Sequence, residues 1–477
     1  MRAHEAGALH GEGGRGGHSG PGWLRPPLDV NALVPALWAR SVRRAAAGPL
    51  TVGGLDVRDI ASEFGTPTYV IDESDFRSRA GDFKHSFGEV FQDLCGGADV
   101  YYAGKAFLCT AVARWIHEEG LGLDVCTGGE LAVAIRAGVP GRLIGFHGNN
   151  KSAPEIEAAL RHKVGRIVVD SFEEIERVAD AAQRLGLVAP VMVRVTVGVE
   201  AHTHEYIATA HEDQKFGFSL AGGEAAEAVR RILDHSRQLS LLGLHSHIGS
   251  QIFDTSGFEV ATRRVLGLHL EVAREHGIQL PELDLGGGFG IAYTTTHDPS
   301  SPRELATGMA LILARECGAE GVPVPKISVE PGRAIAGPST FTLYEVGTVK
   351  EVALDGDASR TYVAVDGGMS DNIRPALYDA DYSCTIAGRV SDATPTLARV
   401  VGKHCESGDI VVKDEFLPSD IRAGDLLAVP VTGAYCRSLS SQYNHVPRPP
   451  VVAVAGGVAR AIVRRETIED ILAQDVD

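Results

Sequence analysis

The chain has no excess of positive charge, no long apolar run and no paired cysteine motif. Each absence argues against one or more classes of protein function. Its 477 residues carry 45 Lys and Arg against 62 Asp and Glu, a net charge of −17. This balance argues against nucleic acid or an anionic membrane as a partner. No apolar run approaches the roughly 20 residues that span a bilayer, and the N-terminus lacks the apolar stretch of a signal peptide. We therefore expect a cytoplasmic protein.

The cysteines are odd in number and scattered, and none forms a CxxC pair. This spacing indicates neither a disulfide framework nor a zinc site, so we expect free thiols and no bound metal. The seven are Cys95, Cys109, Cys126, Cys317, Cys384, Cys405 and Cys436.

Residues 1–27 are rich in Gly, His and Pro and have almost no apolar periodicity, which predicts a disordered tail. Gly11, Gly13 and Gly16 match the GxGxxG spacing of a dinucleotide site. That motif needs a strand before it and a helix after it, and this tail provides neither, so we reject the match.

Eight apolar, β-rich runs alternate with helical patterns between residues 99 and 332. Most are continuously apolar, as expected for strands buried on both faces of a parallel sheet. This alternation predicts a (β/α)8 barrel of the TIM type. The runs are 99–106, 122–127, 142–148, 166–171, 190–196, 241–249, 282–290 and 326–332.

Closely spaced strands with Gly, Asp and Pro turns follow residue 338 and predict a second, antiparallel β domain, a barrel or a sandwich. We expect the segment before the barrel to complete it, so that both chain ends build this domain. The expected domains are 28–71 and 338–477 for the β domain and 72–337 for the barrel.

Chemically active side chains follow the predicted barrel strands, where the functional groups of such barrels lie. We expect a lysine, histidines, a glycine-rich loop and a Glu/Arg pair to meet at one mouth, as at a pyridoxal-phosphate (PLP) site. The side chains and loop glycines are Lys105, Asp124, His147, His245, His247, Gly286, Gly287, Gly288, Glu330 and Arg333.

Lys105 lies among small and apolar neighbours, so we expect a partly desolvated amine that acts as a nucleophile. The LGGGFG run (285–290) leaves backbone N–H groups open to a phosphate, although three glycines also suit a tight turn. In EPGR (330–333), an acid beside a pyridine nitrogen would keep that nitrogen protonated. An ordinary surface ion pair is the alternative there.

Two histidine groups have a metal site as an alternative interpretation. In HSHIGSQ (245–251) one ring would lie on a planar cofactor and Ser250 would bind phosphate. The alternative is that the two histidines bind a metal ion, but the motif contains no carboxylate or cysteine as a further ligand. The segment after the fifth barrel strand carries His202, His204 and His211 with Glu200 and Glu205, and there we expect an active-site loop.

Seven motifs in this order resemble the diaminopimelate decarboxylases, which belong to the alanine-racemase-like, or fold III, PLP decarboxylases. The resemblance covers roughly residues 30–460. YAxKA and GGGFG are shared with ornithine and arginine decarboxylases, whereas CESGD together with NIRPALY is more specific. The motifs are YYAGKA, HSHIGSQ, DLGGGFG, EPGR, DGGMSDNIRPALY, CESGD and GAYC.

This resemblance implies a role for each matching residue. Lys105 would bind PLP covalently, His247 would stack on the ring, and Glu330 would contact the pyridine nitrogen. Cys405 would be the acid that reprotonates Cα, supplied with Glu406 by the second subunit of a homodimer. The other cofactor-binding residues would be Ser250, Gly287, Gly288, Pro331, Gly332, Arg333 and Tyr435. The substrate-binding residues would be Arg333, Arg374, Tyr378, Glu406 and Tyr435.

The implied reaction is decarboxylation of meso-2,6-diaminopimelate to L-lysine, the last step of lysine biosynthesis. Decarboxylation of ornithine, arginine or lysine is the nearest alternative, but those substrates lack the distal carboxylate that paired arginines bind. A racemase of the same fold would need a second base and has little need of CESGD. A catalytically dead binding homologue would be expected to lose Lys105 or Cys405, and both are present.

Overall fold

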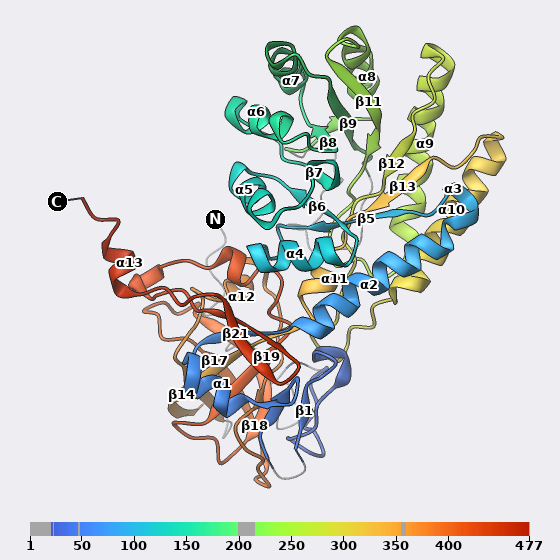
Figure 1. Cartoon of the computed structure of the whole chain (residues 1–477). Helices are drawn as coiled ribbons and strands as arrows, with labels where there is room; N and C mark the ends of the chain where they lie inside the picture. Colours follow the sequence, from blue (N-terminus) through green and yellow to red (C-terminus); the bar gives the residue numbers. More distant parts are fainter. Residues whose placement is uncertain (1–20, 22, 46–47, 199–214, 354–358, 477) are drawn as a thin grey trace. The chain divides into compact units, whose positions relative to one another are not determined.

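The structure is a computed structural model that describes residues 21, 23–45, 48–198, 215–353 and 359–476. It contains two compact units (Figure 1). The barrel unit comprises Arg77–Ile291 and Pro299–Ile335, without residues 199–214. The β unit comprises the described parts of Met1–Phe76, Ala292–Asp298 and Ala336–Asp477. The short segment Ala292–Asp298 lies within the range expected for the barrel and instead belongs to the β unit.

The barrel unit is a closed ring of eight parallel strands, which confirms the (β/α)8 prediction. Each strand pairs with the next, and the last pairs with the first through Ser328 with Asp99 and Val329 with Val100. All eight β-rich runs of the sequence become barrel strands. They are β5 (Asp99–Ala103), β6 (Gly122–Val125), β7 (Ile144–Phe146), β8 (Arg166–Val169), β9 (Ala189–Thr196), β11 (Leu239–His245), β12 (Glu282–Asp284) and β13 (Lys326–Val329).

Helices surround this ring on the outside (Figure 1). Local sequence fixes their ends: Ser152 and Glu155 form a capping box at the start of α6, and Gly186 ends α7 in the left-handed conformation. The helices of this part of the chain are α2 (Glu73–Val90), α3 (Gln92–Cys95), α4 (Thr110–Glu118), α5 (Gly128–Ala137), α6 (Ala153–Arg161), α7 (Phe172–Leu185), α8 (Glu224–Asp234), α9 (Ser256–His276), α10 (Pro302–Glu320) and α11 (Arg333–Ala336).

A buried polar cluster fills the barrel interior below the mouth. Nη1 of Arg166 donates to Oδ2 of Asp284 at 3.0 Å and to Oγ of Ser328 at 2.9 Å. The guanidinium also lies 3.9 Å from the ring centroid of Tyr101. Oδ1 of Asp284 accepts from the backbone N–H of Gly286, so this cluster anchors the start of the glycine-rich loop.

The β unit is built around the long strand β14 (Thr340–Ala353), which pairs with an N-terminal strand, β4 (Thr68–Asp72), and with two strands that follow it in the chain. Strands from both ends of the chain therefore form one sheet, as expected. The sheet is mostly antiparallel, but β15 pairs in parallel with β17, and β4 with β20. The remaining strands are β15 (Ser359–Val365), β16 (Thr385–Ile386), β17 (Pro395–Val401), β18 (Ile410–Pro418), β19 (Leu426–Pro430), β20 (Val451–Ala455) and β21 (Val458–Val463).

Smaller elements complete the β unit. They are β1 (Arg43–Arg44), β2 (Leu50–Val52), β3 (Leu55–Asp56), α1 (Val57–Phe64), α12 (Arg374–Tyr378) and α13 (Ile468–Leu472). Among the described helices, none combines the length and apolar character needed to cross a bilayer. Residues 1–20 of the expected tail, and the loop histidines 202, 204 and 211, lie outside the described residues.

Candidate active site

The barrel mouth contains a cavity of about 390 Å³, a volume typical of small-molecule sites. The polar side chains that line it lie on, or shortly after, six different strands. They include Lys105, Asp124, His147, Arg194, His247 and Glu330. The barrel topology therefore gathers most of the residues that the sequence pattern predicted.

Lys105 follows β5 and lines this cavity. It is exposed, whereas its neighbours Gly104 and Ala106 are buried. This exposure does not agree with the expected desolvation of its amine, because the strand ends at Ala103, two residues before the lysine. An accessible amine opposite buried acidic and imidazole groups remains suited to bond formation with an aldehyde.

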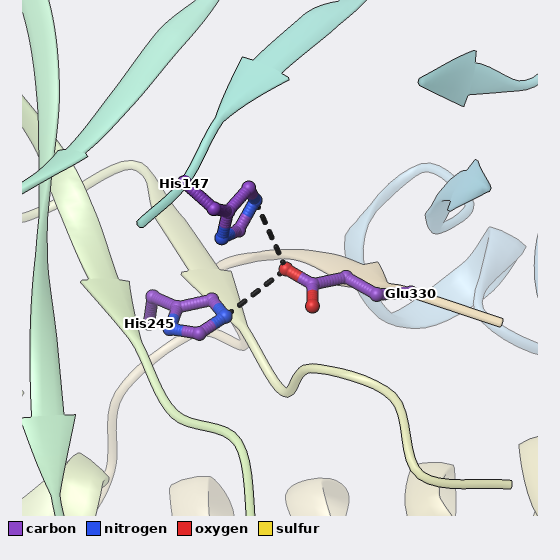
Figure 2. A group of neighbouring side chains, drawn as sticks. All are labelled: His147, His245 and Glu330. Carbon is purple, nitrogen blue, oxygen red and sulfur yellow. Dashed lines mark hydrogen bonds and ion pairs between the residues drawn. The ribbon is translucent and has the colours of Figure 1, made fainter. Parts of the chain in front are cut away.

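Glu330 follows β13 and is only 8% exposed. Its Oε1 lies 3.0 Å from Nε2 of His245 and 3.4 Å from Nε2 of His147 (Figure 2). Burial alone would raise the pKa of Glu330, but the facing histidines hold it well below its usual range. The opposite holds for Asp124, whose pKa is raised well above its usual range by burial and by repulsion from Glu330. Of these two acids that line the cavity, Glu330 therefore ionises at the lower pH.

His247 is held by the glycine-rich loop, because its Nδ1 accepts a hydrogen bond from the backbone N–H of Gly287 at 3.1 Å. An accepting Nδ1 carries no proton, so the ring is neutral with its hydrogen on Nε2. Burial and the nearby charge of Lys105 both lower the pKa of His247, which agrees with a neutral ring.

The glycines of the loop are required by close packing as well as by backbone conformation. A Cβ on Gly287 would lie 2.2 Å from the carbonyl oxygen of Glu330, and one on Gly288 would lie 2.4 Å from that of Gly249. Gly288 also has a φ of 99°, which disfavours side chains. Beside this cradle, Nη2 of Arg333 donates to Oγ of Ser250 at 2.7 Å. The N–H groups of Gly286 and Gly287 are already bound to Asp284 and His247, so the Ser250 hydroxyl and the Arg333 guanidinium are the groups here with the chemistry of a phosphate site.

The other predicted site residues belong to the β unit. Arg374 is buried, and its Nη1 donates to the hydroxyl of Tyr382 at 2.6 Å. Cys405 and Glu406 are exposed, and Tyr378 is half-buried. Tyr435 has a φ of 63°, a conformation that non-glycine residues adopt at a cost.

Among the cavity residues that sequence reasoning missed are Arg194 and Phe216. Arg194 lies on β9, and its guanidinium is 4.3 Å from the ring centroid of Phe216. The available signal was a lone arginine inside the apolar run PVMVRVT. His147 was identified only as a strand-end residue, and its contact with Glu330 depends on the closure of the barrel.

A family model described as "pyridoxal-dependent decarboxylase, pyridoxal binding domain" matches residues 74–337. The chain is 57% identical over 450 residues to diaminopimelate decarboxylase of Mycobacterium tuberculosis, covering 93% of this chain and 98% of that protein. This chain belongs to the diaminopimelate decarboxylase family. It is also 45% identical to the Bacillus subtilis member over 436 residues, covering 91% of this chain and 97% of that protein.

Solved structures agree with this membership. The crystal structure of the family member from M. jannaschii in complex with L-lysine has a TM-score of 0.85 and 31% identity, covering 92% of this chain and 98% of that chain. A lysine/ornithine decarboxylase from Vibrio vulnificus has a TM-score of 0.67 at 21% identity, covering 83% of this chain and 97% of that chain. That second likeness extends to the fold alone. The family relationship does not favour ornithine, arginine or lysine as the substrate.

Proposed function

We propose that this chain is a PLP-dependent enzyme that decarboxylates meso-2,6-diaminopimelate to L-lysine and CO₂. The observation that carries the proposal is the convergence of Lys105 and Glu330 on one cavity of the barrel mouth. Membership of the diaminopimelate decarboxylase family supports the choice of substrate. The implied setting is lysine biosynthesis in the cytoplasm.

The residues of the cavity fit PLP. Lys105 lines the cavity and provides the amine that binds its aldehyde, and Gly287 and Gly288 form a loop whose close packing leaves no room for a side chain. Bound there, PLP supplies an electron sink for the electron pair left on Cα when CO₂ departs. Glu330, held as a carboxylate, keeps the pyridine nitrogen protonated, and His247 supports the ring. Ser250, Pro331, Gly332, Arg333 and Tyr435 complete the proposed cofactor site.

Recognition of the substrate is assigned to Arg333, Arg374, Tyr378, Glu406 and Tyr435. Diaminopimelate carries a second amino-acid head at its far end. A planar guanidinium binds the carboxylate of that head in a bidentate manner, and a carboxylate such as Glu406 pairs with its ammonium. The buried position of Arg374 supports this role, because burial holds its positive charge in one place, whereas a surface side chain would move.

Cys405 is the proposed acid of the second half-reaction. Its thiol transfers a proton to Cα at the position that CO₂ left, and the thiol recovers that proton from solvent. We propose that Cys405 and Glu406 act in the site of the partner subunit of a homodimer. The exposure of both residues is consistent with such a shared site.

The test is a comparison of substrates. CO₂ release is followed with PLP-loaded protein and meso-diaminopimelate, ornithine, arginine or lysine at equal concentrations. The proposal predicts release from diaminopimelate at least about 100-fold faster than from the other three, because only diaminopimelate satisfies the distal charged groups. Faster release from ornithine or arginine would refute the substrate assignment while leaving the cofactor assignment intact.

A further inference from the structure

Two histidines contact the same oxygen of Glu330. His245 ends β11 and His147 follows β7, and the Nε2 atoms of both rings lie 3.0 and 3.4 Å from Oε1 (Figure 2). The rings pack edge to face, with centroids 5.1 Å apart and an interplanar angle of 68°. Each ring therefore limits the rotation of the other, and the pair faces one side of the carboxylate.

The second oxygen of Glu330, Oε2, differs from Oε1 in its hydrogen bonding. No hydrogen bond to Oε2 is made by the part of the chain that the structure describes. Glu330 nevertheless lines the cavity next to Lys105. One oxygen is thus committed to the protein, and the other is available to a group bound in the cavity.

The protonation of His245 follows from its contacts. Nε2 faces a carboxylate oxygen at hydrogen-bond distance, so it carries the hydrogen and donates. Its Nδ1 is buried without a hydrogen-bond partner among the described residues. A proton on that atom would be an unsatisfied buried donor, so the ring is neutral. Burial also lowers the pKa of His147 to about 4, which makes it neutral near pH 7.

We propose that His147 and His245 are positioning residues that hold Glu330 through one oxygen as a carboxylate and leave its second oxygen for the pyridine nitrogen of PLP. This inference rests on the proposed function and deepens it. As a neutral donor, His245 stabilises the negative charge of Glu330 without a formal positive charge that would compete with the pyridinium. His147 makes no hydrogen bond through Nε2 among the described residues, since this atom lies 3.2 Å from Oδ1 of Asp124 and 3.4 Å from Oε1 of Glu330, and its part is to pack against the ring of His245. The other charged or titratable groups that act on this cluster are Lys105, Asp124, Lys151, Arg166, Arg194, His247 and Asp284.

The three side chains also have the composition of a small metal site, because their ligand atoms lie within 4.8 Å of one another. A metal bound there would take up the carboxylate that the positioning role reserves for the pyridine nitrogen. The two interpretations therefore exclude each other, and one experiment can separate them.

The test uses His245→Leu, which removes the donor, and His245→Gln, whose amide restores a donor at a similar position. The control is His269→Leu, which removes another buried histidine of the barrel unit, on helix α9 away from the cavity lining. Three quantities are measured on PLP-loaded protein: the dissociation constant of PLP, the pH dependence of its visible absorbance, and kcat and KM for diaminopimelate.

His245→Leu is expected to weaken PLP binding about tenfold, to lower kcat about 10- to 100-fold and to shift the absorbance titration, with KM changed less than about threefold. His245→Gln should recover most of each loss, and His269→Leu should match wild type. Wild-type PLP affinity and an unchanged absorbance titration in His245→Leu would overturn the proposal. If His245→Leu does not fold, His147→Asn is the second variant. The same changes in PLP affinity and in the absorbance titration are then expected, and their absence would overturn the proposal.

The metal interpretation is tested with Zn²⁺ alone on PLP-free protein. The proposal predicts no stoichiometric binding, and tight binding of one Zn²⁺ that is lost in His245→Leu would overturn it. The proposed function fails in a different way, by absence of CO₂ release in the wild-type protein. PLP affinity and absorbance of the variants decide the positioning role independently of that result.

Discussion

Arg374 is held between two tyrosines of the β unit: Nη1 donates to the hydroxyl of Tyr382 at 2.6 Å, and the guanidinium lies 4.6 Å from the ring centroid of Tyr293. The two rings meet edge to face with centroids 5.3 Å apart. Nε of Arg374 is buried without a hydrogen-bond partner among the described residues. An unsatisfied buried donor at a fixed position is suited to receive a substrate carboxylate.

Tyr382→Phe is therefore expected to raise KM for diaminopimelate about tenfold, with kcat changed much less. The lost hydrogen bond orients the guanidinium that we propose binds substrate and transition state alike. Steady-state kinetics test this, with Tyr362→Phe on β15 as the control. An equal fall in kcat and in kcat/KM, with KM unchanged, would contradict the positioning of Arg374 by Tyr382.

Asp371 predicts a pH dependence of stability in the β unit. Its Oδ1 accepts from the hydroxyl of Tyr344 and its Oδ2 from the backbone N–H of Gly368, and burial raises its pKa to about 7. The folded pKa exceeds the unfolded value of about 3.9, so the stabilisation from the protonated form is complete below pH 4 and is lost as the pH rises through 7. The loss reaches up to about 4 kcal/mol.

Asp371→Asn removes this titration, because the amide oxygen can accept from Gly368 while the NH₂ group donates to Tyr344. We expect denaturant midpoints of the variant to change less between pH 5 and pH 8.5, and the variant to be at least as stable as wild type at the higher pH. Parallel pH profiles for the two proteins would show that Asp371 titrates at its ordinary value.

A buried ion pair in the barrel unit predicts a loss of stability. Nζ of Lys151 lies 2.8 Å from Oε1 of Glu174, and both side chains are almost fully buried. Lys151→Met leaves the carboxylate buried without its partner and should cost about 3–5 kcal/mol, whereas Lys151→Met/Glu174→Gln should recover more than half. Arg161→Met, which breaks an exposed pair with Glu157, should cost less than about 1 kcal/mol.

Denaturant unfolding of the four proteins tests this ranking. A cost for Lys151→Met as small as that for Arg161→Met would contradict it. The pair also matters for the cavity, since Nζ of Lys151 donates to the carbonyl of Gly148, which belongs to the cavity wall.

Periodicity and strand-end position predicted most of the barrel mouth. Lys105, Glu330 and the glycine-rich loop were found because each directly follows an apolar run, and strand ends of a barrel meet at one face. The contact of His147 with Glu330 could not be predicted, because it depends on how far each strand extends. The contact of Tyr293 with Arg374 could not be predicted either, because Ala292–Asp298 belongs to the β unit although the sequence around it forms the barrel.

The mixture of parallel and antiparallel pairing in the β sheet was also not predicted. Short strands with polar turns indicate antiparallel neighbours, but β4 and β20 come from opposite chain ends and pair in parallel. Sequence patterns describe local segments and carry little information about pairing across several hundred residues.

The proposed homodimer with shared sites predicts complementation between inactive variants. Lys105→Ala and Cys405→Ala should each be inactive alone. After the two are mixed, unfolded and refolded together, hybrid dimers should restore about a quarter of wild-type activity, because half of the dimers are hybrid and each has one intact site. Complete absence of restored activity in hybrid dimers that bind PLP would place Lys105 and Cys405 of one site on the same subunit.

The central claim is that Lys105 performs PLP chemistry on diaminopimelate. The most direct measurement is L-lysine formation from meso-diaminopimelate, together with the visible absorbance of lysine-bound PLP, for wild type, Lys105→Ala and the exposed-lysine control Lys350→Ala. Wild type and Lys350→Ala should form lysine and show the absorbance, and Lys105→Ala should lose the absorbance and at least about 1000-fold in rate. Lysine formation by Lys105→Ala at the wild-type rate would contradict the account.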